Sequence, residues 1–585
     1  MENIKIKALR KALNDHKIDV YYLNTSDYHL SEYVPSYFKT IKYFSGFTGS
    51  LATFLIDKNK SYIFVDGRYH IQADKECLPN GVEVIKLGTK DGLDPLDFIE
   101  KNYKGKVIGI DGKRTSINFA KELIKRGLKV KSIDIYSDLI EGRPSLSKDK
   151  LYEVDVTNVG ISRKEKIDNV KYCLNGKSHI VDNLESIAYI LNLRGNDIIY
   201  TPVFLAYLVF NKDDVYLFID LERLTPEIIE KLFDDGVIIR PYNEYYKFLS
   251  TLKNETILLD EYKVNYDSYK KIRGHHNKIV NTISLIEEMK SCKNRVEVEN
   301  SMKAHIYDGV AMVRFLKWLD ESDKSTLNEY DALERLNKFR LEYKAFDLSF
   351  SPIVAYNDNA AMMHYSPTKE NNTKLDNSGI LLVDSGGQYK EGTTDITRTI
   401  ALGEVSDKLK KHFTIVLKSM FNLSQTRFMA GLSGYQLDIL ARKDIWELGI
   451  DYRCGTGHGV GHILAVHEAP PNIRYMNTAS GSEKVPLKVG NIVSDEPGIY
   501  LEGEYGIRCE NLLTVEEDIN NEYGKFLKFK TLTLVPFDLR LIDLNYLDEK
   551  TRAILNNYHR EVYEKLSPYL NEDETEYLRK ITREI

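Results

Sequence analysis

Two neighbouring strings decide the fold of this chain, LLVDSGG at residues 381–387 and GTTDITRT at residues 392–399. The first is an apolar run of the kind found in buried strands, and Ser-Gly-Gly ends it directly after Asp384. The second alternates, so that Asp395 lies on the opposite strand face from Ile396. A short glycine-containing connection joins the two strings. We therefore predict two paired strands, hairpin-like, that bring both aspartates close together.

Three further strings carry similar residues: GTGHGVGH at 455–462, SDEPGIY at 494–500 and GIRCEN at 506–511. Glycines around His458 argue against a helix, so His458 and His462 are not the paired ligands of a helical zinc-protease motif. The same run lacks the spacing of a dinucleotide fingerprint and of a P-loop. Glu496 falls at a strand end before Pro-Gly. We expect Arg508 and Glu510 to share one strand face, where Arg508 could orient Glu510.

Each of these residues alone has an ordinary structural explanation. Aspartates cap turns, a single histidine is more often hydrogen-bonded than metal-bound, and Arg–Glu pairs are common on surfaces. The set decides the interpretation, because four carboxylates gathered without a cation would repel one another and lose hydration. The predicted ligands are Asp384, Asp395, His458, Glu496 and Glu510. This oxygen-rich set favours hard divalent ions, and two ions sharing a water imply hydrolysis.

The composition excludes several other classes of protein. The chain has 585 residues, 42% hydrophobic and 29% charged, with a formal net charge of −6. This length predicts three to four domains, and no basic run suggests nucleic-acid binding. The charged N-terminus lacks a signal-peptide stretch, and no segment is apolar over a bilayer's width. Scattered cysteines without a CxxC motif suit a reducing compartment. We therefore expect a cytoplasmic protein without nucleic-acid or membrane partners.

The remaining sequence predicts a mixed α/β protein with a repeat in its first half. An apolar strand ends at Asp66 in SYIFVDGRYH and at Asp220 in DVYLFIDLERL, which suggests two related α/β units in tandem. Later helices are predicted over 327–341, within 406–449 and in the tail, after a helix with one apolar face at Met302, Ile306, Val310, Val313 and Leu316. The expected parts are residues 1–147, 148–288, 289–520 and 521–585.

The five strings, with His364 in AAMMHYSP and His467 in AVHEAP, resemble the pita-bread metallopeptidases of family M24. This group includes methionine aminopeptidase, prolidase, aminopeptidase P and creatinase. The long, three-domain cytosolic aminopeptidases P are most similar, over nearly the whole chain. GFTGSLATFLID resembles their first domain, NLRGNDIIYTPVFLAYL their second and LTLVPFDLRLID their tail. The implied fold is two creatinase-N-like α/β domains, a pita-bread catalytic domain and a C-terminal extension that packs on it or at a dimer interface.

The resemblance implies a role for each ligand. Asp384 would bind one ion and His458 the other, although Asp384 also contributes to both in the usual pattern. Asp395 would be a bidentate ligand, and Glu510 would bridge the ions. Glu496 would be a ligand that also passes a proton from the nucleophilic water to the leaving amine. The implied cofactor is two divalent ions, Mn²⁺ first, with Co²⁺, Fe²⁺ or Zn²⁺ as alternatives.

Further residues receive roles outside the ligand set. His467 would stabilise the tetrahedral intermediate or the scissile carbonyl, and His364 would contact the substrate. Cys454 stands where animal relatives carry a substrate-pocket histidine, and this smaller, more weakly hydrogen-bonding residue implies a proline pocket of different shape. Arg508 is a further candidate for substrate binding, and it could also orient Glu510 or join a proton relay behind it. Arg68 could be structural or reach a partner subunit's site.

The implied reaction is hydrolysis of the bond between an N-terminal residue and a following proline in peptide substrates. The resemblance also implies that the enzyme is a homodimer. Proline lacks the backbone N–H that ordinary peptidases read, so a dedicated pocket is needed. Two alternatives stay open: another pita-bread hydrolase such as prolidase, and a peptide-binding module without catalysis. A second N-terminal domain counts against prolidase. The complete ligand set counts against both a creatinase-like enzyme and the binding module.

Overall fold

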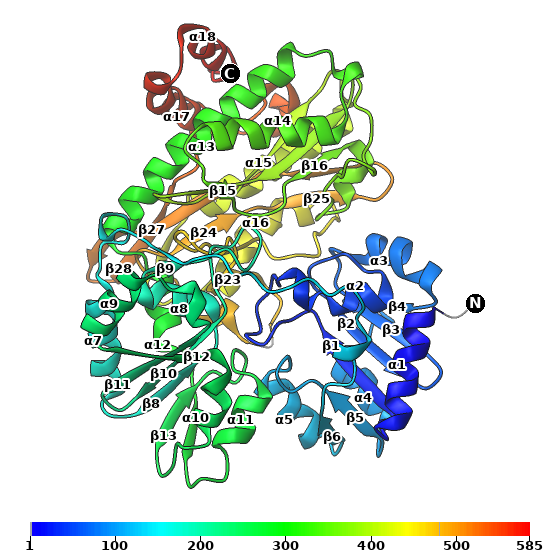
Figure 1. Cartoon of the computed structure of the whole chain (residues 1–585). Coiled ribbons are helices and arrows are strands. Elements are labelled where there is room, and N and C mark those ends of the chain that lie inside the picture. The colour runs from blue at the N-terminus through cyan, green and yellow to red at the C-terminus, as the bar shows by residue number, and fades with distance from the viewer. Residues whose placement is uncertain (1–2, 479) are drawn as a thin grey trace. The chain divides into compact units, whose positions relative to one another are not determined.

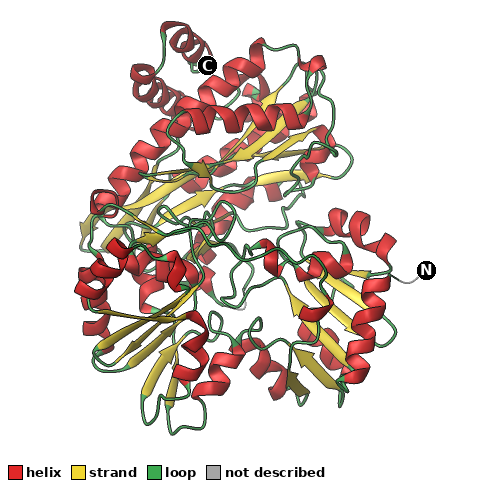
Figure 2. Ribbon diagram, viewed as in Figure 1, coloured by secondary structure: helices red, strands yellow, loops and turns green. Residues whose placement is uncertain are grey.

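The computed structural model describes residues 3–478 and 480–585 (Figure 1). They form two compact units, one of residues up to 155 with 161–288, and one of 156–160 with 289–585. Both units mix helices and strands, so the predicted α/β class is confirmed (Figure 2). Among the described helices, none combines the length and the apolar character that crossing a bilayer requires.

The first unit contains two six-stranded sheets of identical topology. Their strand orders are β4-β3-β2-β1-β5-β6 and β12-β11-β10-β8-β13-β14. In both sheets, neighbours among the second, third and fourth strands in this order pair antiparallel, and the other neighbours pair parallel. The tandem repeat predicted from sequence is therefore confirmed. Asp66 and Asp220 follow the equivalent strands β3 and β11.

The strands of these sheets are β1 (Val20–Asn24), β2 (Thr53–Asp57), β3 (Ser61–Val65), β4 (Glu83–Lys86), β5 (Val107–Ile110), β6 (Lys129–Ser132), β8 (Ser178–Val181), β10 (Ala206–Asn211), β11 (Asp214–Ile219), β12 (Val237–Pro241), β13 (Thr256–Leu259) and β14 (Lys278–Asn281). Their helices are α1 (Ile4–Asp15), α2 (Thr40–Ser45), α3 (His70–Cys77), α4 (Pro95–Tyr103), α5 (Ile117–Lys125), α7 (Arg163–Leu174), α8 (Leu184–Leu191), α9 (Pro226–Asp234), α10 (Tyr245–Leu249), α11 (Tyr266–Ile272) and α12 (Leu285–Ser291). Strand β1 shows why helices cover both sheet faces. Tyr21 and Leu23 pack into one apolar cluster and Val20 and Tyr22 into another.

The second unit is built on a six-stranded antiparallel sheet, β21-β28-β27-β24-β22-β23, and a three-stranded sheet, β16-β17-β20. The large sheet comprises β21 (Arg427–Met429), β22 (Gly457–Gly459), β23 (Glu468–Ile473), β24 (Ile492–Asp495), β27 (Asn511–Asn521) and β28 (Gly524–Thr531). The smaller one comprises β16 (Ile353–Tyr356), β17 (Ile380–Ser385) and β20 (Ile396–Ala401). Short sheets add β15 (Asp347–Leu348), β18 (Gly387–Tyr389), β19 (Gly392–Thr393), β25 (Gly498–Leu501) and β26 (Tyr505–Arg508).

The helices of this unit cover its sheets and join the tail to them. They are α13 (Arg295–Glu321), α14 (Glu329–Glu342), α15 (Asp407–Ser424), α16 (Gly434–Trp446), α17 (Glu549–Leu566) and α18 (Glu572–Ile581). The apolar face predicted for α13 is confirmed, since Val310, Val313 and Leu316 are buried. Residues 406–449 form two helices with β21 between them. The second helix starts afresh at a capping box on Ser433.

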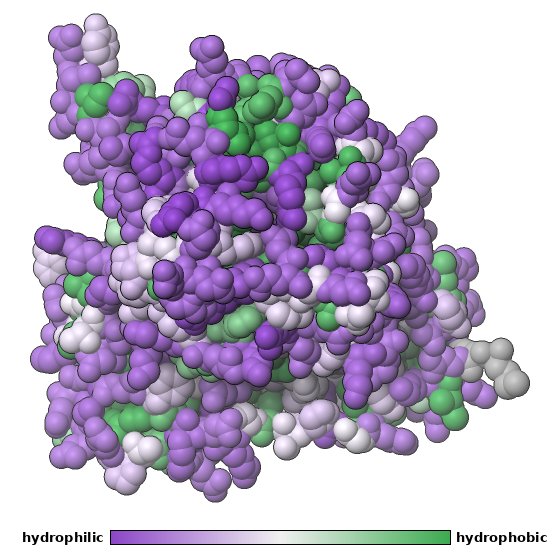
Figure 3. All heavy atoms as spheres, turned by 90° about the horizontal axis from the view of Figure 1, so that it is seen from above, coloured by the Kyte–Doolittle hydropathy of each residue, from purple (hydrophilic) through white to green (hydrophobic). Residues whose placement is uncertain are grey.

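Apolar side chains of the tail pack into the core of the second unit. Leu555 and Val562 of α17 and Leu578 of α18 share one cluster with Val310 of α13. Burial of such side chains contributes roughly 1.5–3 kcal/mol each, which fixes the tail to this unit. On the face shown in Figure 3, hydrophilic side chains dominate and hydrophobic ones form separate patches, which is ordinary for a protein surface.

Candidate metal centre

The five predicted ligands lie at or near the ends of strands that pair with one another. Asp384 is the penultimate residue of β17, and Asp395 directly precedes β20. His458 is the middle residue of β22, Glu496 directly follows β24, and Glu510 directly precedes β27. The pairing of β17 with β20 brings the two aspartates together, as predicted. The pairing of β22, β24 and β27 does the same for the other three ligands.

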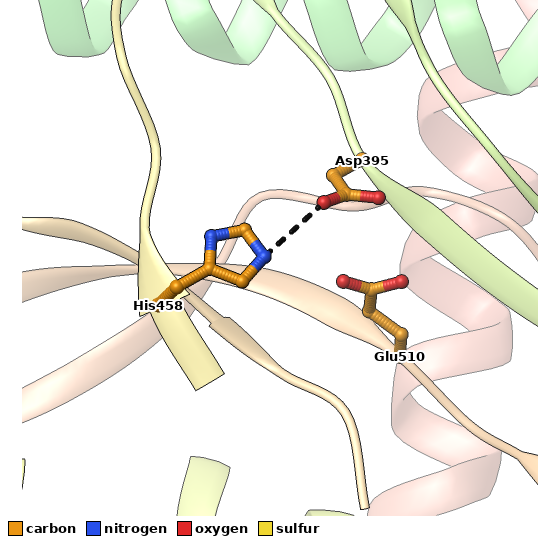
Figure 4. Close-up of side chains that lie close together, drawn as sticks. All are labelled: Asp395, His458 and Glu510. Carbon is orange, nitrogen blue, oxygen red and sulfur yellow. Dashed lines mark ion pairs between the residues drawn. The ribbon is translucent and has the colours of Figure 1, made fainter. Parts of the chain in front are cut away.

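The side chains converge on one point. Ligand atoms of Asp395, His458 and Glu510 all lie within 4.8 Å of one another, and Figure 4 shows the imidazole and the two carboxylates facing each other. His458 Nε2 lies 3.5 Å from Asp395 Oδ2 and 3.3 Å from Glu496 Oε1. Asp384 belongs to the same group of charges, since the negative charges of Asp395 and Glu496 both raise the pKa of its carboxyl.

The backbone around His458 fixes the orientation of its imidazole ring and connects it to Glu496 through hydrogen bonds. Nδ1 lies 2.8 Å from the carbonyl of Gly459, which leaves Nε2 to face the carboxylates. Ser494 Oγ accepts a hydrogen bond from the His458 N–H at 3.0 Å and donates one to Glu496 Oε1 at 3.0 Å. A Cβ on Gly457 would lie 2.0 Å from the Ser494 carbonyl oxygen, so β22 approaches β24 this closely only with glycine there.

Arg508 reaches the centre in a way that corrects one expectation. The sequence predicted that Arg508 and Glu510 share one strand face, but β26 ends at Arg508 and β27 begins at Asn511 in another sheet. Between the two strands, Glu510 donates its backbone N–H to the carbonyl of Thr397 at 3.2 Å. Arg508 Nη2 donates to Asp384 Oδ2. Its Nε donates to Thr397 Oγ1 at 3.0 Å, and that hydroxyl donates to Glu510 Oε2 at 2.8 Å.

The electrostatics of the centre favour bound cations. Burial raises the pKa of Asp384 to about 7, against the opposing effect of Arg508. Burial, with the charges of Asp395, Glu496 and Asp384, raises the pKa of Glu510 well above its usual range. Burial lowers the pKa of His458, but Asp395 and Glu496 outweigh it and raise the pKa to about 9. Repulsion of this kind is relieved by divalent ions.

The donor set fits the two divalent ions that the sequence implied. Within the described part of the chain, the buried Oδ1 of Asp384 has no hydrogen-bond partner. A buried carboxylate oxygen without a partner is costly unless a cation or a proton meets it. Carboxylate oxygens with one imidazole nitrogen suit hard or borderline ions such as Mn²⁺. The carboxylate and imidazole groups already present would therefore suffice as ligands for such ions.

The other predicted site residues lie in loops of the same unit. His467, half-buried, directly precedes β23, and its ring centroid lies 4.3 Å from that of His458 with the ring planes at 75°. His364, also half-buried, follows a short helical turn at Asn357–Ala361 that packs on β26. Cys454 precedes β22, packs against a hydrophobic cluster, and accepts a hydrogen bond from Arg442 through its carbonyl oxygen. Their roles toward substrate stay predictions, as does that of Arg68, which forms an ion pair with Asp66 in the first unit.

Two residues that matter here were missed from the sequence, Thr397 and Ser494. Thr397 lies two residues after Asp395, and Ser494 two residues before Glu496. In a strand, residues two apart share a face. That spacing was a usable signal, because a hydroxyl on the ligand face of a strand is placed to orient the ligand.

Comparison with known proteins gives the family. The model of metallopeptidase family M24 matches residues 299–517, and its C-terminal region matches 525–585. Two models of the creatinase/prolidase N-terminal domain match residues 5–143 and 142–297.

Individual relatives are similar to this chain over nearly its whole length. "Probable Xaa-Pro aminopeptidase P" of Pyrenophora teres f. teres is 35% identical, over 97% of this chain and 90% of its own. That of Leptosphaeria maculans is 35% identical, over 97% and 96%. The crystal structure of X-prolyl aminopeptidase from Caenorhabditis elegans, described as a cytosolic enzyme with a di-nuclear active site, has a TM-score of 0.94 at 30% identity and covers 99% of both chains.

Fold and site together define a pita-bread metallopeptidase with two creatinase-type N-terminal domains. The chain belongs to metallopeptidase family M24 and, within it, to the Xaa-Pro aminopeptidase P family. The resemblance inferred from the sequence is thereby confirmed.

Proposed function

We propose that this chain is a metal-dependent aminopeptidase that removes the N-terminal residue from peptides with proline in the second position. The observation that carries the proposal is the convergence of four carboxylates and His458 at paired strand ends. The names of relatives aligned over nearly the whole chain support the substrate class. We propose Mn²⁺ as the ion at both positions, held by Asp384, Asp395, His458, Glu496 and Glu510.

Two bound divalent ions would lower the pKa of the attacking water and polarise the scissile carbonyl. Glu496, fixed by Ser494, takes the proton of the attacking water and passes it to the leaving prolyl nitrogen. His467 donates a hydrogen bond to the carbonyl oxygen as negative charge develops there. His364 contacts the substrate. Arg508 does not act on the substrate but orients two ligands, because it binds Asp384 directly and Glu510 through the Thr397 hydroxyl.

Selection of proline needs an apolar wall rather than a hydrogen bond to a P1' N–H, which proline lacks. Cys454 and Tyr500 pack against the same hydrophobic cluster, and Tyr500 accepts a hydrogen bond from Arg508 at 2.8 Å. A thiol beside an aromatic ring offers an apolar surface. We assign these two residues to the wall that faces the proline ring.

We further propose a cytoplasmic homodimer with the four-part division predicted from the sequence. The nematode structure is described as cytosolic, which supports the compartment. The ranges matched by the four family models support the division. An exposed apolar stripe on α16, formed by Tyr435, Ile439 and Trp446, supports a contact between two copies.

The test compares three peptides, Arg-Pro-Pro, Gly-Pro and Arg-Ala-Ala, with metal-stripped protein before and after Mn²⁺ is added. Release of Arg from Arg-Pro-Pro only after addition, with Arg-Ala-Ala uncut, is the expected result. Cleavage confined to Gly-Pro would identify a prolidase instead. Absence of cleavage together with absence of bound metal would identify a peptide-binding module.

A further inference from the structure

A buried ion-pair cluster lies directly beside His467. Glu468 follows His467 in the chain and is 4% exposed. Its Oε2 accepts a hydrogen bond from Lys290 Nζ at 2.8 Å, and its Oε1 accepts one from Lys293 Nζ. Both lysines are 5% exposed. One buried carboxylate is thus paired with two buried ammonium groups. Lysine is rarely buried in proteins unless its charge is paired in this way.

The segment that carries the two lysines is also fixed to the start of β24. The Lys293 N–H donates to the carbonyl of Gly490 at 2.9 Å, and Asn491 Nδ2 donates to the carbonyl of Ser291 at 2.9 Å. Gly490 has φ +86°, and a Cβ there would lie 2.3 Å from the Lys293 carbonyl oxygen. The segment therefore connects the start of β24, which leads to Glu496, with the start of β23, which follows His467.

Chain continuity links the cluster to the imidazole. His467 directly precedes β23, and the first residue of that strand, Glu468, is held by the two lysines. The His467 ring lies edge-on to that of His458, at a centroid distance of 4.3 Å. Release of Glu468 would let the backbone at the start of β23 turn, and a displacement of about 1 Å in an active site can cost roughly a hundredfold in rate.

We infer that Glu468, clamped by Lys290 and Lys293, is a positioning residue that holds His467 in register with the metal centre. The inference rests on the role proposed above for His467. A purely stabilising role explains the cluster poorly, because a buried ion pair adds little net stability compared with apolar residues of the same volume. What such a pair does supply is a fixed geometry at one position of the chain.

The test is a double-mutant cycle in the metal-loaded enzyme. kcat, KM and bound metal are measured for the wild type, Glu468→Gln, His467→Ala and the double variant, with Arg-Pro-Pro as substrate. Each single variant is expected to lower kcat roughly ten- to a hundredfold, with KM and metal content near the wild-type values. The double variant is expected to be no slower than His467→Ala, because Glu468 acts through that ring.

Each departure from this pattern has a distinct meaning. Losses that multiply in the double variant, or a Glu468→Gln enzyme with undiminished kcat, overturn the positioning role and leave the proposed function standing. A His467→Ala enzyme with undiminished kcat overturns the role of His467 and this inference with it. Loss of Xaa-Pro cleavage by the metal-loaded wild type would instead overturn the proposed function.

Two further variants guard against a failure to fold. Lys290→Met keeps Lys293 paired with Glu468, so it leaves no buried charge alone, and we expect it to fold with a lowered kcat and unchanged KM. Asp197→Asn is the matched control, since it breaks the buried pair with Arg223 in the first unit. We expect it to lower the thermal midpoint without changing kcat. A folded Lys290→Met enzyme with wild-type kcat overturns the inference.

Discussion

Glu496 binds metal and moves a proton in the proposed mechanism, and the two tasks can be separated at this residue. Ser494 donates to its Oε1, and its own N–H donates to the carbonyl of Thr456 at 2.8 Å. Glu496→Gln keeps the volume but cannot take up a proton. We expect kcat for Arg-Pro-Pro to fall about 10²- to 10⁴-fold while the thermal midpoint changes little. Glu502→Gln, at an exposed glutamate of the following hairpin, is the control. Near-normal turnover by Glu496→Gln would rule out the shuttle.

The titration of Asp384 makes a prediction about metal-stripped protein. Its pKa in the folded chain is raised to about 7 by burial, whereas an unfolded aspartate titrates near about 3.9. Between these values the folded state retains a proton that the unfolded chain releases. The carboxyl therefore makes folding less favourable as pH rises from about 4 to about 7. The pKa of His458, raised to about 9, also makes the folded state less stable as pH rises. The stability that the protonated imidazole contributes is fully present below about pH 6.5 and is lost as pH rises through about 9.

We accordingly expect the thermal midpoint of the metal-stripped chain to fall more gently with pH in Asp384→Asn than in the wild type, between pH 4.5 and 7.5. The measurement is a series of melting curves in the presence of a chelator. The wild-type chain should also gain more from added Mn²⁺ at pH 7.5 than at pH 5, because the ligands must lose protons to bind. Identical pH dependence in both proteins would show that Asp384 is not buried as described.

At the scale of elements, the contact between β22 and β24 sets the distance between His458 and Glu496. Gly457→Ala places a Cβ 2.0 Å from the Ser494 carbonyl oxygen, so the two strands must separate. We expect loss of bound metal and a lower thermal midpoint. Gly455→Ala is the matched control two residues earlier, because its nearest neighbour would be 3.5 Å away. Metal analysis of both purified proteins makes the comparison, and equal metal content in the two would contradict the account.

Local pattern predicted most of these elements and left out a few connections. The strand ends near Asp384 and before Glu496 were predictable, because an apolar run followed by glycine or proline marks a strand end. The break between Arg508 and Glu510 was not, because a period of two does not reveal where a chain passes from one sheet to another. The cluster at Lys290 and Lys293 was missed as well. Lysine in a sequence is read as a surface residue, and only tertiary packing shows that these two are buried.

For the whole molecule, the proposed homodimer is tested at the apolar stripe on α16. Tyr435, Ile439 and Trp446 are 42%, 51% and 38% exposed and lie four and seven residues apart, on one helix face. We expect Ile439→Glu to convert a dimer into a monomer in sedimentation experiments at micromolar concentration. Tyr523→Glu, which replaces an exposed ring at the β27–β28 turn, should stay dimeric. A dimeric Ile439→Glu protein would show that the contact lies elsewhere.

The most direct test of the account is a titration of the metal-stripped chain with Mn²⁺, in which bound ions per chain and Arg release from Arg-Pro-Pro are followed together. We predict that binding saturates at two ions per chain, that activity rises to its maximum with the second ion, and that Glu510→Gln abolishes this activation. Two results would contradict the claim that five residues at paired strand ends hold a catalytic pair of metals. One is full activity in the presence of a chelator, and the other is activity that reaches its maximum while no Mn²⁺ is bound at this centre.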